Sequence, residues 1–99
     1  MSATVEIARF KVSEAAEAGL VSTWPAMVEA MRRAHPALRS VSLVRFDDGT
    51  WADIALWDDP ASAAALACDA GPSLPEVREF FAHIAEDISL DLARVVKHV

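Results

Sequence analysis

Two tryptophans and one aspartate share a face of a segment that alternates between polar and apolar residues. If Thr50–Trp57 is a strand, then Trp51, Asp53 and Trp57 point the same way. Such a set can form an aromatic pocket wall with one carboxylate, which serves as a general base or as an anchor for a ligand. The alternative is that the tryptophans pack in the core or at a dimer interface while Asp53 pairs with an arginine.

His83 is a second candidate for acid–base chemistry, because histidine titrates near neutral pH. It follows Phe80 by three positions in a segment with helical periodicity, so it lies beside the apolar stripe of that helix. From a pocket it could serve as a general base that removes a proton from a bound molecule. The alternative is a histidine at the surface or at the boundary of the core.

The remaining residues with metal-binding or nucleophilic side chains have simpler interpretations. His35 precedes a proline at a helix end, and His98 is close to the C-terminus. Cys68 is the only cysteine, so it forms neither an internal disulfide nor a thiolate metal cage. The pairs Asp47–Asp48 and Asp58–Asp59 suit a turn and a helix cap. We therefore expect no metal site and no cofactor.

A long helical segment supplies further apolar residues that can line a pocket or fill the core. Leu20, Trp24, Met27 and Met31 fall on one stripe at helical spacing. Methionine adapts well to irregular sites. The complete set of predicted ligand-binding residues is Trp51, Trp57, Trp24, Phe80 and Met27, with His83 and Asp53 as the catalytic candidates.

Charged residues on the predicted strands suggest a second arrangement. Three arginines project from strands, and three carboxylates lie on strands as well, so charge pairs can form across the seam between two sheets. The residues concerned are Arg9, Arg45 and Arg94 with Glu6, Asp53 and Asp91.

Composition limits the function classes. The formal net charge is −6, which argues against nucleic-acid binding and against binding to an anionic membrane surface. Hydrophobic residues make up 54% of a 99-residue chain, so part of the apolar surface should enter an oligomer interface or a ligand pocket. The chain shows no secretory signal and no apolar run long enough for a membrane span, so we expect a cytosolic protein.

The periodicities predict one domain over residues 1–99. The expected elements are a strand Thr4–Val12, a helix Glu14–Ala34, strands Val41–Phe46 and Thr50–Trp57, helices Ala61–Ala70 and Leu74–Ala85, and a strand Asp87–Lys97. Asp47-Asp48-Gly49 predicts a hairpin turn, and Gly71-Pro72-Ser73 separates the two short helices. Pro25 either kinks the long helix or lies in the first turn of a second one that is capped by Ser22 or Thr23.

This order predicts an α+β fold with a four-stranded antiparallel sheet in a split βαβ arrangement, with the helices on one face. The other face of the sheet is then uncovered. Because it also carries apolar residues, we expect a second copy of the chain to cover it in a homodimer.

The pattern resembles the antibiotic biosynthesis monooxygenase superfamily of dimeric α/β barrels. The resemblance runs nearly end to end and lies in Val5–Phe10, Ala34-His35-Pro36, Leu43-Val44-Arg45 and the segment Ala55–Ala61. It implies a ferredoxin-like domain that forms a dimeric α/β barrel, with a pocket in each subunit between sheet and helices. Some members of this superfamily oxygenate polycyclic phenols without metal or flavin; others degrade haem or isomerise small metabolites.

Two functions follow from the resemblance and from the residues. The first is a cofactor-independent monooxygenase, or an isomerase, acting on a small aromatic or polyketide-like molecule. The second is a non-catalytic barrel that binds a small hydrophobic or aromatic molecule or serves as an accessory subunit. The resemblance to the superfamily favours the first. The second is favoured by the lack of any Asn, which haem-degrading members use on the first strand, and by Ala55 at a position where many oxygenase-like members have an acidic residue.

Overall fold

The computed structural model describes residues 3–69 and 74–98, and of residues 65–69 it describes the backbone alone. The elements are, in chain order, β1 (Thr4–Lys11), the 3-10 turn η1 (Glu14–Ala16), α1 (Glu17–Ala34), β2 (Leu38–Arg45), β3 (Trp51–Trp57), α2 (Pro60–Asp69), α3 (Pro75–Phe81) and β4 (Glu86–Arg94). The predicted break at Gly71-Pro72-Ser73, the last residue of the predicted helix Ala61–Ala70 and the side chain of Cys68 lie outside what is described.

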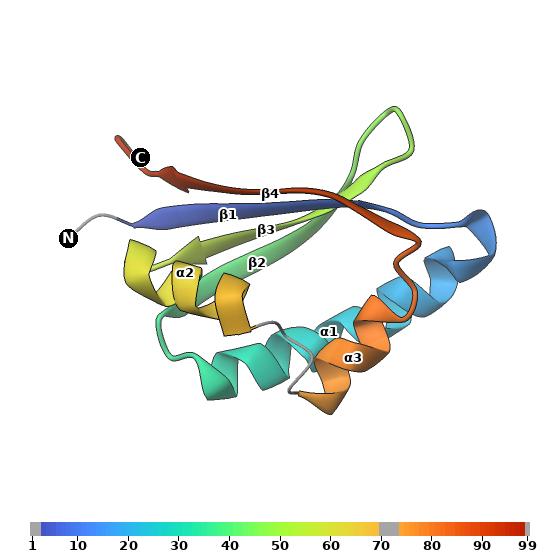
Figure 1. The fold of residues 1–99 in the computed structure, drawn as a ribbon, viewed down its shortest axis with the longest axis horizontal. Coiled ribbons are helices and arrows are strands. Elements are labelled where there is room, and N and C mark those ends of the chain that lie inside the picture. The colour runs from blue at the N-terminus through green and yellow to red at the C-terminus, as the bar shows by residue number, and fades with distance from the viewer. Residues whose placement is uncertain (1–2, 70–73, 99) are drawn as a thin grey trace.

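The four strands form one antiparallel sheet in the order β2-β3-β1-β4. The helices lie on a single face of this sheet (Figure 1). The predicted α+β fold with a split βαβ arrangement is therefore confirmed. In the described part of the chain no helix is long and apolar enough to cross a membrane.

Pro25 lies inside one continuous helix, so the alternative of two helices is wrong. Proline has no N–H for the carbonyl of Val21, but both residues are exposed and water can bind that carbonyl. The hydroxyl groups of Ser22 and Thr23 donate to the Gly19 carbonyl at 3.1 and 2.9 Å instead of capping a new helix.

Some boundaries differ from the prediction because tertiary contacts extend or shorten the elements. Strand β2 begins at Leu38, three residues early, because the buried Leu38 pairs with Trp57 of β3. Helix α3 ends at Phe81, four residues early. Just beyond it the Ala85 N–H donates to the Lys11 carbonyl at 2.8 Å, so the chain has already turned toward the end of β1.

The turn between β2 and β3 is formed as predicted. Gly49 adopts a φ of +88°, which residues other than glycine rarely adopt. The Asp48 carboxylate accepts hydrogen bonds from the backbone N–H and the hydroxyl of Thr50, at 2.9 and 2.6 Å. These bonds fix the turn without any contribution from the core.

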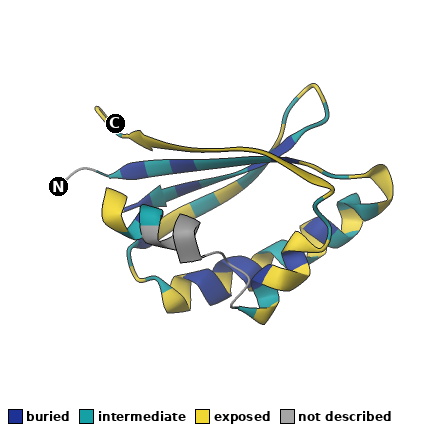
Figure 2. Cartoon of the chain, in the orientation of Figure 1, coloured by how far each residue is buried: buried dark blue, intermediate teal, exposed yellow. Residues whose placement is uncertain are grey.

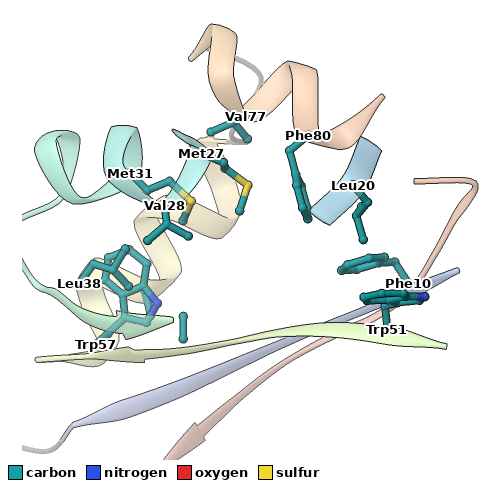
Figure 3. Packing of buried hydrophobic residues seen from close by; sticks show 12 residues of the cluster. Phe10, Leu20, Met27, Val28, Met31, Leu38, Trp51, Trp57, Val77 and Phe80 are labelled. Carbon is teal, nitrogen blue, oxygen red and sulfur yellow. The ribbon is translucent and has the colours of Figure 1, made fainter. Parts of the chain in front are cut away.

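Buried residues gather where the helices face the sheet, whereas β4 is exposed along its whole length (Figure 2). Figure 3 shows two groups of buried side chains. Phe10, Leu20, Trp51 and Phe80 lie together at one end, and Val28, Met31, Leu38 and Trp57 lie together at the other. The rings of Phe10 and Phe80 meet edge to face with centroids 6.0 Å apart. Large buried side chains therefore gather at the two ends of the core.

Candidate functional site

On the helix-facing side of β1 and β3, small and acidic residues lie in the middle, and aromatic residues lie at both ends. Antiparallel pairing sets four cross-strand pairs on this face, which are, from one end to the other, Thr4–Trp57, Glu6–Ala55, Ala8–Asp53 and Phe10–Trp51. Large aromatic rings occupy both outer pairs. The two inner pairs contain only alanines and carboxylates, and alanine leaves the space above it empty.

A cavity of about 390 Å³ lies over these inner pairs. All four inner residues line it, together with apolar side chains from the helices and the neighbouring strands: Met27, Met31, Val41, Val77, Phe81, Ile88 and Leu90. Its volume is near the lower end of the range for ligand pockets, roughly 300–1,000 Å³. Apolar walls around a few polar groups are typical of a small-molecule site.

Asp53 is the most perturbed acid in this cavity. The indole N–H of Trp24, on α1, donates to Asp53 Oδ1 at 2.9 Å. Burial, against the lowering effect of the Trp24 hydrogen bond and with a contribution from the nearby negative charge of Glu6, raises the pKa of Asp53 to about 6. Near neutral pH this carboxylate can therefore both accept and return a proton.

Glu6 forms a second indole–carboxylate pair in the same cavity. The N–H of Trp57 donates to Glu6 Oε1 at 2.9 Å, and Glu6 is 9% exposed. Burial raises the pKa of Glu6, while the hydrogen bond from Trp57 lowers it. The two acids are diagonal neighbours on adjacent strands, so their charges affect each other.

In the described part of the chain neither acid has a cationic partner. Arg9 directs its guanidinium away to Asp48, at 2.9 Å, and over the ring of Phe46, at 4.0 Å from the centroid. Arg45 pairs with Glu17 at 3.5 Å. The prediction that Glu6 and Asp53 pair with arginines across a sheet-to-sheet seam is wrong, because both face the helices.

The structure separates the two predicted catalytic residues. Asp53 lines the cavity, whereas His83 is not among the lining residues. The His83 ring lies directly against Gly19 of α1, where a Cβ atom would collide with Nε2. His83 lies two residues beyond the end of α3, and its Nδ1 is 3.0 Å from the carbonyl oxygen of Glu79 on that helix. The ring of His83 therefore packs against α1 and does not line the cavity.

The predicted ligand-binding residues divide in a similar way. Met27 lines the cavity, and Trp24 acts on it through the hydrogen bond to Asp53. Trp51, Trp57 and Phe80 are buried in the core and do not line the cavity.

Sequence reasoning placed Glu6 at a dimer seam and so missed its position in the cavity. The sequence did indicate this position, because Glu6 lies on the same strand face as Thr4, Ala8 and Phe10, and these three residues suit a core. A carboxylate in that position is either costly or functional.

Among the described residues no group of three or more His, Cys, Asp or Glu side chains is arranged to hold a metal ion. The chemistry that the described site itself offers is proton transfer by two carboxylates within an apolar cavity.

No family sequence model matches the chain, and no curated protein sequence is similar to it. Solved structures do resemble it. A candidate antibiotic biosynthesis monooxygenase from Bordetella bronchiseptica superimposes with a TM-score of 0.81 at 14% identity, covering 98% of this chain and 100% of that one. SnoaB, a cofactor-independent oxygenase from Streptomyces nogalater, in its N63A mutant, gives a TM-score of 0.72 at 20% identity and covers 100% and 98%.

A third structure with this fold, a protein of unknown function from Nitrosomonas europaea, gives a TM-score of 0.73 at 10% identity and covers 100% of this chain and 94% of that one. The expected resemblance to the antibiotic biosynthesis monooxygenases is thus confirmed for the fold over the whole chain. At these identities the likeness carries no residue roles.

Proposed function

We propose that this protein is a cofactor-independent monooxygenase that acts on a small aromatic or polyketide-like molecule in the cavity between the sheet and the helices. The observation that carries the proposal is the Asp53 carboxylate, which lies in an apolar cavity of about 390 Å³ with its pKa raised to about 6. The fold it shares with SnoaB, a cofactor-independent oxygenase, supports the same reaction class.

In this proposal Asp53 removes a proton from a hydroxyaromatic or anthrone-type substrate. The resulting anion is rich in electrons, and it combines with dioxygen to give a peroxide anion, which takes the proton back from Asp53 and becomes a hydroperoxide. Loss of water then leaves the quinone, so one O₂ is consumed for each water and quinone formed. The apolar walls support the first step, because a carboxylate with few water molecules around it is a stronger base.

Trp24 holds Asp53 in place through its N–H. A general base must lie within hydrogen-bond reach of the proton it removes, so a carboxylate held in one position removes that proton faster than a mobile one. The other oxygen of Asp53 accepts no hydrogen bond from the described part of the chain, which leaves it for the substrate.

Oxygen consumption tests the proposal, with anthrone as the probe substrate. We expect uptake of one O₂ per anthrone and one ¹⁸O atom from ¹⁸O₂ in the anthraquinone. Asp53→Asn keeps the shape and the bond to Trp24 but removes the base, so the rate should fall by roughly 10²–10⁴. His83→Ala is the comparison variant, because an equal loss there would transfer the role of base to His83.

The same experiment decides between an enzyme and the alternative, a non-catalytic protein that binds small molecules. Saturable binding of anthrone without oxygen uptake would establish the second function. An Asp53→Asn variant as fast as the wild type would refute the catalytic role of this residue.

We also propose that the protein is a cytosolic homodimer that pairs the outer faces of two sheets into an α/β barrel. This outer face carries Val5, Ile7, Ile54 and Leu56, and in the described part of the chain no helix covers it (Figure 1). Burying such a face against a copy of itself would stabilise both. Sedimentation at micromolar concentration tests this, and a stable monomer would refute it.

A further inference from the structure

The cavity carries negative charge that no described side chain neutralises. Among the described residues that line it, three have carboxylates, which are Glu6, Asp53 and Asp87, and Arg9 is the only arginine or lysine. The guanidinium of Arg9 is already bound to Asp48 and Thr50 and stacked over Phe46. A cleft of one sign with apolar walls attracts ligands of the opposite charge.

Glu6 is the carboxylate that is best placed to bind such a charge. It is 9% exposed, and Trp57 fixes one of its oxygens through a hydrogen bond of 2.9 Å. The second oxygen accepts no hydrogen bond from the described part of the chain. A carboxylate in an apolar cavity is stabilised when a donor or a cation meets its remaining oxygen. In this cavity a ligand can supply that donor.

We propose that the cavity selects aromatic molecules that carry a protonated amine, and that Glu6 is the residue that binds the ammonium group. The proposal rests on the proposed function in that it takes the same cavity as the ligand site. It divides the two acids by role. Glu6 holds the cation, and Asp53 stays free to accept a proton from the ring. The apolar part of the ligand lies against Met27, Met31, Val77 and Leu90.

Two other ligand charges fit this cavity less well. An anionic ligand would meet three carboxylates and no free arginine or lysine among the described lining residues. An uncharged ligand with one hydroxyl group would give one of the two acids a second hydrogen bond, but it would leave the negative charge of the cavity uncompensated. An ammonium group has three donors and the opposite charge, so it satisfies Glu6 most fully.

Three ligands of similar size and different charge test the inference in calorimetric titrations: naphthylmethylamine, naphthylmethanol and naphthoate. With the wild-type protein near neutral pH, we expect the amine to bind roughly tenfold or more tightly than the alcohol, because hydrogen bonds to charged groups are the stronger ones. Naphthoate should bind more weakly than the alcohol. An alcohol or a naphthoate that binds as tightly as the amine would overturn the proposal.

Glu6→Gln assigns the effect to one residue. Glutamine can still accept the Trp57 N–H, so the core should survive, and we expect the preference for the amine over the alcohol to fall roughly tenfold. Glu29→Gln is the matched control, because Glu29 is exposed on α1 and does not line the cavity, so it should leave the preference unchanged. A preference that survives in Glu6→Gln would refute the role of Glu6.

Two further measurements keep the inference separate from folding and from catalysis. If Glu6→Gln does not fold, the wild type is titrated from about pH 7.5 to about pH 4.5, where Glu6 and Asp53, whose pKa values are raised by burial, take up protons. Amine binding should weaken over this range while alcohol binding stays constant, and constant amine binding would refute the proposal. Asp53→Asn should keep most of the preference for the amine while losing oxygenation, so failure of the proposed function and failure of this inference give different results.

Discussion

The inner face of the sheet contains two regions built from the same two strands in opposite ways. The aromatic end consists of Phe10, Trp51, Phe80 and Leu20, all buried and in contact across the layer (Figure 3). The hollow centre consists of the inner pairs Glu6–Ala55 and Ala8–Asp53, which lie under a cavity of about 390 Å³. One region fills its space with rings, and the other leaves its space open.

The difference shows where this small domain accepts a loss of stability. Burial of aromatic rings is among the largest stabilising contributions in a core. One buried carboxylate, one half-buried carboxylate and an unfilled cavity have the opposite effect. Sites that break the rules of core packing are commonly functional, and here the exception is confined to two adjacent pairs of one strand ladder.

The largest expected effect comes from emptying the aromatic end. Phe80→Ala should lower the free energy of unfolding by about 3–5 kcal/mol, because it leaves a cavity under α3. Phe81→Ala is the control on the same helix, and it should cost much less because Phe81 is 44% exposed. Urea denaturation measures both. Equal losses in the two variants would contradict the view that Phe80 is packed in the core while Phe81 is not.

The next effect belongs to the hollow centre and depends on pH. Because the folded-state pKa of Asp53 is raised to about 6, above the value in the unfolded chain, its contribution to stability is complete below about pH 4. That contribution is lost as the pH rises through 6. Asp53→Asn removes this dependence. Between about pH 4 and about pH 7.5 the free energy of unfolding of the wild type should therefore fall by about 2–3 kcal/mol more than that of the variant.

Urea denaturation at several pH values measures this difference. A difference between variant and wild type that does not change with pH would mean that burial does not perturb Asp53. Glu29→Gln is again a suitable control, since Glu29 is exposed and pairs with Arg33 at the surface.

Removing the indole partner should have a somewhat smaller effect. Trp24→Phe keeps most of the apolar surface but removes the hydrogen bond of 2.9 Å to Asp53, which at neutral pH should cost roughly 1.5–3 kcal/mol. Because that bond lowers the pKa of Asp53, its loss should move the acid limb of the pH–rate profile to higher pH. A shift to lower pH would show that Trp24 does not stabilise the ionised form.

The smallest effect on stability is expected from filling the hollow centre. Ala8→Leu should change the free energy of unfolding by less than about 1 kcal/mol, because the cavity can accept the larger side chain. It should nevertheless abolish binding of naphthylmethylamine, measured by calorimetry. Full binding in this variant would show that the ligand lies elsewhere.

Most of the fold was predictable because its local signals agree. The alternation in β1 and β3, the Asp48–Gly49 turn and the helical stripe of α1 each indicate the observed element. The exceptions depend on tertiary contacts. Pro25 is accepted within α1, and β2 begins early because Leu38 pairs with Trp57.

The site was predictable only in part. Asp53 and Met27 were expected and do line the cavity, and Trp24 contacts it through Asp53. His83 satisfied every criterion of residue type and spacing, yet its ring lies against Gly19. Periodicity predicts which face of a helix a residue occupies, but it does not predict which neighbour that face meets.

By itself, the amino-acid sequence determined which residues share a face of each strand, because side chains alternate along a strand whatever lies around them. The alternation therefore places Glu6 on the same face as Ala8 of one strand, and Asp53 on the same face as Ala55 of another. Only the tertiary structure decided that these two strands lie next to each other with those faces under α1 and α3, since strand order and register come from long-range pairing. The same packing buried the two carboxylates, and burial is what raises their pKa values and makes Asp53 a candidate base.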